Sequence, residues 1–165
     1  MLIVFFGCSY LGVRASSALR LRRDMLRSMQ SGIGRLSMWM DYTAQPLAVL
    51  ARRTKTTDTE VFWEMFAKKL KDNADVATAW QQAMTHARTR EPGFAALKEC
   101  DICVLEEYAQ GLGGSNRKTQ AKNAALLQQR LEAIVQEAQD AYGSKGRMYR
   151  SVGILSGLAA AILLW

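Results

Sequence analysis

Residues 124–141 read AALLQQRLEAIVQEAQDA, and they carry the clearest signal of fold class in the 165-residue chain. Their apolar residues recur at intervals of three and four, at Ala124, Leu127, Leu131, Ile134, Ala138 and Ala141. This spacing places one apolar stripe along an α-helix, a pattern typical of antiparallel bundles and coiled coils. The stretch therefore predicts a helix that packs along its length against other helices.

The rest of the central chain favours helices as well. Only Pro46 and Pro92 interrupt it, and no sustained alternation of polar and apolar residues indicates a strand. We therefore expect an all-α fold, an antiparallel bundle of about six helices. Besides the helix from residue 124, helices are expected over 18–40, at Pro46, after Thr57, after Asp75 and over 94–110.

Short signals predict where these helices begin and end. Thr57 and Glu60 have the spacing of a capping box, in which two side chains bond the free N–H groups of a helix start. Asp75 is expected to cap the next helix, and Thr43 the short helix at Pro46. Gly111 suits the left-handed position that often ends a helix. The side chains expected to face the core are Phe62, Met65, Phe66, Leu70, Val76, Trp80, Ala83, Met84, Ala87, Leu97, Cys100, Val104 and Tyr108.

The formal net charge is +7, from 22 lysines and arginines against 15 acidic residues. The excess flanks the two ends of the chain, where 2–13 and 151–165 carry no charged side chain. Basic residues that adjoin an apolar segment stay on the cytosolic side of a membrane. The flanking basic residues are Arg14, Arg20, Arg22, Arg23 and Arg27 at one end, and Lys145, Arg147 and Arg150 at the other.

These features predict a membrane segment at each end of the chain. We expect an N-terminal membrane segment over 1–19, a cytosolic helical-bundle domain over 20–148 and a C-terminal membrane segment over 149–165. Both segments are short, since a span usually needs roughly 20 residues. Gly153 and Gly157 have the G-x-x-x-G spacing that lets membrane helices approach closely.

Residues 111–120, GLGGSNRKTQ, superficially suggest a phosphate-binding loop. A P-loop requires Gly, four residues, then Gly-Lys-Ser/Thr, so that backbone N–H groups surround the phosphates. Here the two glycine positions hold Leu112 and Arg117. The loop therefore does not predict nucleotide binding, and no cofactor is expected.

The same loop has a simpler structural interpretation. Gly113 and Gly114 allow a tight reversal between two antiparallel helices, and Ser115 or Asn116 caps the second. Gln120 falls on the backward extension of the apolar stripe. The residues that remain for a contact with a partner protein are Arg117, Lys118 and Lys122.

The chain offers few groups for chemistry. Cys100 and Cys103 form one C-x-x-C, but no second pair follows, and the single His86 lies apart. Zinc sites need four ligands, so no metal site is expected, and the two cysteines are interpreted as small core residues. His86 is interpreted as a surface or boundary residue, and Asp101 with the acids at 106–107 as a solvated helix face. No catalytic constellation emerges, and we expect a protein that is not an enzyme.

Two stretches resemble a known family. Leu112-Gly113-x-Ser115-Asn116, followed by Gln120-x-Lys122, and the tail over 147–164 are similar to stage III sporulation protein AB. The resemblance extends more loosely over nearly the whole chain, through the basic run after an apolar start and PLAVLARR at 46–53. Two positions depart from the family pattern: Asn116 replaces the usual Asp, and Asn123 stands where the family often has His.

The resemblance implies both an architecture and a role. It implies a cytosolic six-helix domain similar to one repeat of the type II secretion inner-membrane platform protein. It also implies a place in endospore formation, in the mother-cell membrane facing the forespore, within a channel-like complex. The implied partners are a secretion-type ATPase, the other membrane proteins of that complex and the lipid bilayer.

Two other classes of function stay open at this point. A basic helical bundle can bind nucleic acid through its arginines, although 18–40 contains no recognisable reader motif and no nucleic-acid partner is expected. The chain could instead be a soluble coiled-coil adaptor whose apolar tail docks on a partner. The oligomeric state is open, with a homo-oligomer among the alternatives.

Overall fold

The computed structural model describes residues 2–43, 45–72, 74–112, 126–144, 148 and 151–152, with side chains from residue 14 onward. Every regular element among these residues is a helix and none is a strand, which confirms the expected all-α fold. The helices are α1 (Leu2–Tyr42), α2 (Leu47–Thr54), α3 (Glu60–Lys71), α4 (Val76–Arg90), α5 (Pro92–Ala95) and α6 (Glu99–Leu112), followed by helical residues 126–144.

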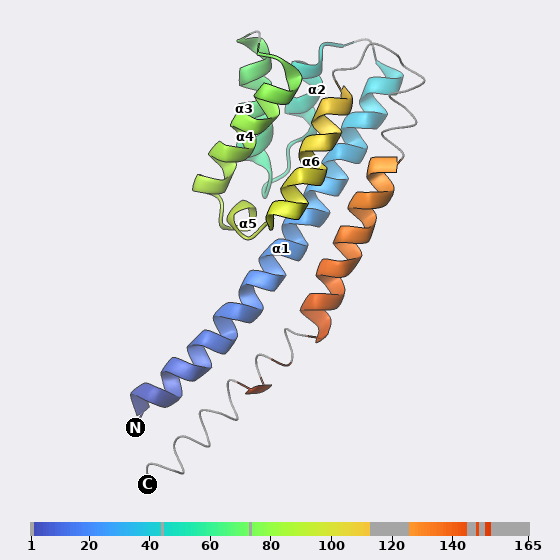
Figure 1. Cartoon of the computed structure of the whole chain (residues 1–165). Helices are drawn as coiled ribbons and strands as arrows, with labels where there is room; N and C mark the ends of the chain where they lie inside the picture. The colour runs from blue at the N-terminus through green and yellow to red at the C-terminus, as the bar shows by residue number, and fades with distance from the viewer. Residues whose placement is uncertain are drawn as a thin grey trace.

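Helix α1 is the spine of the molecule (Figure 1). Its 41 residues correspond to a length of about 60 Å at the usual rise of an α-helix. The α2–α5 helices gather beside its C-terminal half, where α3 packs on both α2 and α4. We call α2–α5 and the core beneath them the aromatic lobe.

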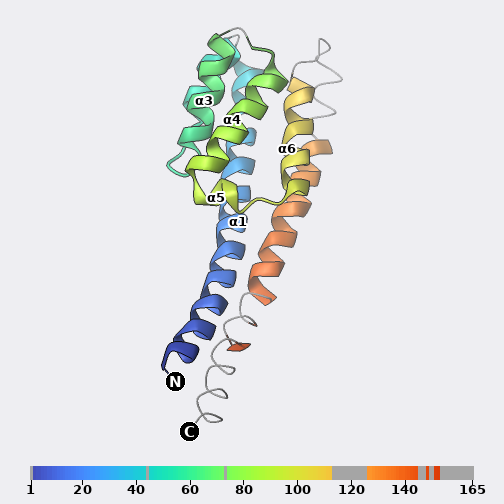
Figure 2. The same cartoon turned by 60° about the vertical axis from the view of Figure 1, so that its left-hand side comes forward.

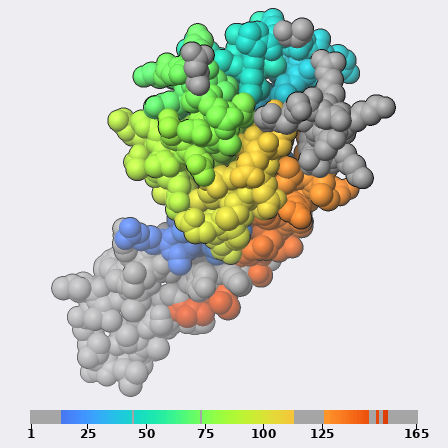
Figure 3. Space-filling model, turned by 45° about the horizontal axis from the view of Figure 1, so that its top comes forward, coloured from blue at the N-terminus to red at the C-terminus, as the bar shows by residue number. Residues whose placement is uncertain are grey.

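The other side of the spine is covered by α6 and the helical segment 126–144, which run in opposite directions (Figures 1 and 2). Figure 3 shows α6, in yellow, exposed between the green α4 and the orange segment 126–144. We call the contact of α1, α6 and 126–144 the polar seam. The expected stripe faces this contact: Leu131 and Ala138 are buried, and Leu127 and Ile134 pack against the core.

Aromatic rings fill the lobe. Trp80 on α4 is fully buried, and its ring meets those of Phe62 and Phe66 edge-on, with centroids 4.8 and 5.2 Å apart. Edge-to-face contacts of this kind add to the burial of the rings themselves. The expected inward positions are confirmed here, but Trp63, which is also fully buried, was missed. The fully buried rings are Phe62, Trp63, Phe66, Trp80 and Phe94.

A glycine lets the lobe approach the spine. A Cβ atom added at Gly32 on α1 would lie 2.9 Å from the ring of Trp63 on α3. That is closer than real Cβ contacts, and an indole ring packed on all sides cannot yield easily. At Gly34, one half-turn further along α1, the same atom would meet nothing within 4 Å. Gly32 therefore sets the distance between α1 and α3.

The helix expected over 94–110 is interrupted. Helix α5 ends at Ala95 and α6 begins anew at Glu99, and this break shifts which positions face inward. Cys100 and Cys103, expected in the core, are exposed. The buried face of α6 consists instead of Asp101, Ile102, Leu105, Tyr108 and Ala109.

Of the N-terminal caps expected for α3 and α4, one is confirmed and one is wrong. The Asp75 carboxylate accepts a hydrogen bond from the Ala77 N–H at 3.2 Å, as a cap should. Thr57 lies in a turn before α3, which has no side-chain cap. Glu60 is the first helical residue and binds Lys55 at 2.6 Å instead of completing a capping box.

Two further end signals act differently from the expectation. Thr43 closes α1 rather than opening α2: its hydroxyl donates to the Trp39 carbonyl at 2.7 Å. Pro46 precedes α2 in the cap position and contributes no side-chain hydrogen bond. Gly111 lies within α6, which continues to Leu112. The expectation that Gly111 ends the helix is therefore wrong.

The described residues do not support the expected membrane helices. Within the described ranges, no helix is both long enough and apolar enough to cross a membrane. Residues 2–19 of the expected N-terminal segment belong to α1, which passes residue 19 without a break. Most of the segment expected over 149–165, including Gly153 and Gly157, lies outside the described residues.

Candidate functional site

The loop singled out in the sequence lies largely outside the described residues. Leu112 is the last residue of α6, and residues 113–125 are not described. The roles expected in this loop therefore stay predictions. They concern Gly113, Gly114, Ser115, Asn116 and Gln120 as a corner and cap, and Arg117, Lys118 and Lys122 as a partner contact.

The polar seam contains a buried ion pair that the sequence analysis missed. Arg22 on α1 donates from Nε and Nη2 to the two carboxylate oxygens of Asp101 on α6, at 2.7 and 2.8 Å. The side chains are 3% and 0% exposed. Paired N–H groups facing a carboxylate form the strongest arrangement available to an arginine. Asp101 was expected on a solvated face, and the structure corrects this to the most buried acidic position on α6.

Asp101 also begins α6. One carboxylate oxygen accepts the Lys98 backbone N–H at 2.9 Å, as the third residue of a helix does when it bonds back to the cap position. Glu137 from the segment 126–144 joins the cluster, 3.5 Å from Arg22 and 3.4 Å from the Lys98 ammonium. The cluster thus ties three helices together through one arginine.

These contacts bias the charge states of the pair. Burial raises the pKa of Asp101, but hydrogen bonds from Arg22 and from the Lys98 N–H outweigh it, so the net pKa lies below the ordinary value. The hydrogen bond to Asp101 raises the pKa of Arg22 despite the opposing effect of burial. Both groups therefore stay ionised at neutral pH.

Neighbouring arginines of the N-terminal cluster also contact the segment 126–144. The Arg23 guanidinium lies 4.4 Å from the centroid of the Tyr142 ring, and Arg27 donates to the Gln139 side chain. Glu107 on α6 binds Arg130 at 2.7 Å. Part of the basic cluster that the sequence suggested as a membrane flank therefore joins helices within the molecule.

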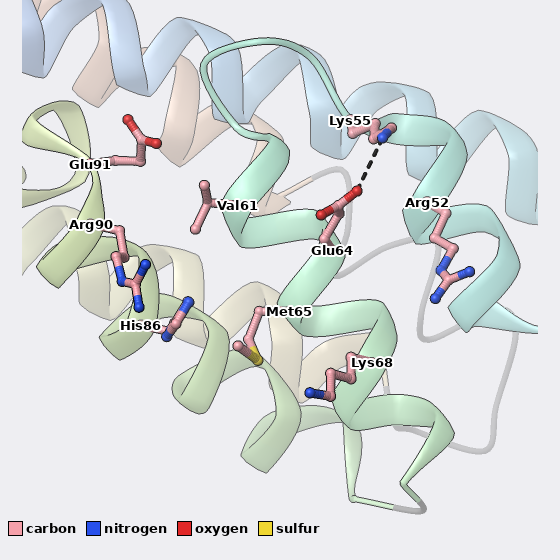
Figure 4. Close-up of a pocket in the computed structure, with 9 residues that line it drawn as sticks. All are labelled: Arg52, Lys55, Val61, Glu64, Met65, Lys68, His86, Arg90 and Glu91. Carbon is pink, nitrogen blue, oxygen red and sulfur yellow. Dashed lines mark hydrogen bonds and ion pairs between the residues drawn. The ribbon is translucent and has the colours of Figure 1, made fainter.

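A second feature is a groove of about 800 Å³ on the aromatic lobe, between α3 and α4 beside the end of α2 (Figure 4). Val61 and Met65 of α3 give it an apolar floor, and both are half-buried. His86 on α4 lines the groove and is half-buried, which confirms its interpretation as a boundary residue.

Cations outnumber carboxylates around this groove, four to two. Glu64 is occupied by Lys55 at 3.1 Å, and the bonds to Glu60 and Glu64 raise the pKa of Lys55. The cations whose side chains make no ion pair or hydrogen bond within the described residues are Arg52, Lys68 and Arg90. The second carboxylate is Glu91.

The described residues offer no metal centre. No group of three or more His, Cys, Asp or Glu side chains among them could hold a metal ion. Cys100 and Cys103 carry free thiols on the surface of α6. The groove and the ion-pair cluster are each lined or formed by several charged side chains from more than one helix.

The comparisons with known proteins agree with one another. A family model described as Stage III sporulation protein AB (spore_III_AB) matches residues 1–165. Stage III sporulation protein AB of Bacillus subtilis (strain 168) is 23% identical over 165 residues, 98% of this chain and 94% of the relative. A solved structure of Stage III sporulation protein AB (SpoIIIAB) matches with a TM-score of 0.64 and 22% identity, covering 74% of this chain and 97% of that chain. At that identity the structural match concerns the fold.

Proposed function

This chain belongs to the stage III sporulation protein AB family, and from that premise we propose that it is a membrane-anchored scaffold subunit of a secretion-like channel complex in endospore formation. The scaffold couples a cytosolic secretion-type ATPase to the membrane components of the complex. It is located in the mother-cell membrane, with the domain over 20–148 in the cytosol. The observation that carries this proposal is the family match along the entire chain.

The chemistry of the described residues suits a scaffold. The charged side chains with the deepest burial, Arg22 and Asp101, join helices to one another and do not line the groove between α3 and α4. The proposal therefore assigns no catalytic residue. It assigns the anchoring role to the apolar ends, 1–19 and 149–165, because basic residues adjoin each of them.

Membrane anchoring is tested first. The full chain and a version that ends at Arg150 are expressed in bacteria, and the membranes are extracted with alkaline carbonate. The full chain should stay in the pellet, and loss of 151–165 should release a substantial part of it. Release of the full chain would contradict anchoring and favour the adaptor whose apolar tail docks on a partner protein.

ATPase coupling is tested separately. Arg117 and Lys118 in the predicted loop are replaced together by alanine, and the folded state is checked by the helical circular-dichroism signal. Recruitment of the ATPase in a pull-down should weaken if these side chains contact it. Unchanged recruitment would remove the loop from the interface without affecting the anchoring result.

A further inference from the structure

We propose that the groove between α3 and α4 is a docking site for an acidic segment of a partner protein. This proposal rests on the scaffold role proposed above, because it assigns the surface through which the scaffold holds a partner. It differs from the loop expectation, because the groove lies on α2–α4 and uses none of residues 113–125.

The arrangement of charge points to an anionic ligand. Glu64 has its cation in Lys55, which leaves Arg52, Lys68 and Arg90 facing the groove against the single carboxylate of Glu91. Figure 4 shows the Lys68 ammonium and the His86 ring extending from α3 and α4 into the space between the two helices. Carboxylates of a ligand in that space would give these cations the ion-pair partners that they lack among the described residues.

The apolar floor of the groove favours a peptide over other anionic ligands. Val61 and Met65 lie between the charged rims, so the groove offers contacts to aliphatic as well as acidic side chains. The carboxylates of Glu64 and Glu91 would repel a uniformly anionic lipid surface, whereas a peptide can place an amide or an aliphatic group beside them. Mixed rims around an apolar centre are the usual anatomy of a protein-binding surface.

The dimensions suit a short peptide. A volume of about 800 Å³ exceeds what a single inorganic anion fills and falls among the pockets that bury whole ligands. The lining residues of α3 run from Val61 to Lys68, a span of about 10 Å along a helix. An extended chain covers that length with about three residues.

The cations of the groove could instead serve only to stabilise the end of α3, and a matched pair of lysines distinguishes this structural role from ligand binding. Lys68 and Lys71 both lie in the last turn of α3, where positive charge interacts favourably with the negative end of the helix dipole. Lys71 is exposed and does not line the groove. Replacing either by glutamate changes the net charge and the helix end equally, so only Lys68→Glu should affect docking.

The sole histidine of the chain, His86, provides the readout. The untagged full chain is held in a nonionic detergent, and its imidazole NMR signals are followed during titration with a capped hexapeptide that alternates glutamate and leucine. The signals should shift saturably, with a Kd of about 1 mM for a few exposed charge contacts. The same peptide with glutamine in place of glutamate should cause no saturable shift.

The variants and competing ligands complete the test. Lys68→Glu should weaken peptide binding at least about fivefold, and Lys71→Glu should leave it within about twofold of the parent. Inorganic phosphate at equal concentration and vesicles of phosphatidylglycerol with phosphatidylcholine should shift the His86 signals less than the peptide does.

Each contrary outcome overturns the proposal. Absence of a saturable shift removes the site, and equal losses in the two variants reduce the effect to net charge. A larger response to phosphate indicates a small-anion site, and a larger response to vesicles indicates a membrane contact. Because the titration needs neither ATPase nor bilayer, failure here leaves the carbonate and pull-down results standing, and their failure leaves the titration standing.

Discussion

The aromatic lobe and the polar seam hold their helices by different means. In the lobe, the rings of Trp63 and Trp80 pack against their neighbours without directed polar contacts, since neither indole N–H group has a hydrogen-bond partner among the described residues. In the seam, Arg22 and Asp101 meet through two aligned hydrogen bonds. Ring packing is strong but weakly directional, whereas a buried fork contact tolerates little change in geometry. The lobe therefore contributes cohesion, and the seam sets how α6 and 126–144 lie against α1.

The largest expected effect tests the lobe. Trp80→Ala should lower the free energy of unfolding by about 4 kcal/mol, because it removes a fully buried ring and leaves a cavity. Urea unfolding of the full chain, followed by circular dichroism, measures the loss. Trp39→Ala is the control, since Trp39 is only partly buried and should cost about half as much or less. Equal losses would show that the lobe is not the centre of cohesion.

The seam should respond somewhat less at neutral pH, and in a pH-dependent way. Asp101→Asn should cost about 3 kcal/mol at pH 7, because it leaves the Arg22 charge buried without its main partner. The folded-state pKa of Asp101 is depressed, so its stabilisation is present above the unfolded pKa of about 4 and is lost as pH falls through the folded pKa. The difference between parent and variant should therefore shrink below about pH 4, whereas that of Trp80→Ala should not.

A double replacement sharpens this contrast. Arg22→Met with Asp101→Leu removes both charges, and such exchanges of a whole buried pair are often close to neutral, within about 1 kcal/mol. If the double variant is as unstable as Asp101→Asn, the pair supplies net stability and not only geometry. If the double variant is instead about as stable as the parent, the ion pair adds no net stability and its role is to fix how the helices pack.

The lobe was largely predictable from the sequence, and the seam was not. Phe62 and Phe66 on α3 and Trp80 on α4 each follow the helical period of their own helix, so their burial followed from local pattern. The pairing of Arg22 with Asp101 spans 79 positions and depends on tertiary placement. One local signal existed, because Asp101 shares a helical stripe with Leu105 and Tyr108. That signal was hidden by the unrecognised break between α5 and α6.

The cysteines show the same limit. Cys100 was assigned to the core because a helix running unbroken from 94 would carry it there together with Leu97 and Val104. Helix α6 starts again at Glu99, and its phase follows Asp101, whose carboxylate holds the Lys98 N–H. Pattern reasoning finds buried faces where a helix is continuous. It fails where a buried polar contact starts a new helix and so changes which positions face the core. The groove is formed by residues of three helices, so no single stretch of sequence predicts it.

Substitutions at the contact between the aromatic lobe and α1 should change stability by an intermediate amount. Gly32→Ala should destabilise the chain by about 1–3 kcal/mol, because the new methyl group meets the packed ring of Trp63. Gly34→Ala, in open space on the same helix, should stabilise it by about 0.5–1 kcal/mol through helix propensity. Thermal unfolding of both variants measures the opposite signs. A gain for both would show that α1 and α3 can separate without cost.

The smallest expected effect compares two aspartates that serve helix starts. Asp75 accepts one N–H at 3.2 Å on the surface of the lobe, and Asp101 accepts one at 2.9 Å inside the seam while it also holds Arg22. Asp75→Ala should therefore cost about 1 kcal/mol, the usual value of an exposed cap. Thr57→Ala should change stability by less than about 0.5 kcal/mol, since Thr57 caps nothing in the structure. The urea unfolding midpoints of the two variants measure both losses of stability. If Thr57→Ala loses as much stability as Asp75→Ala, the capping box at α3 exists after all. If Asp75→Ala loses nearly as much as Asp101→Asn, burial adds little to the stability that a cap supplies.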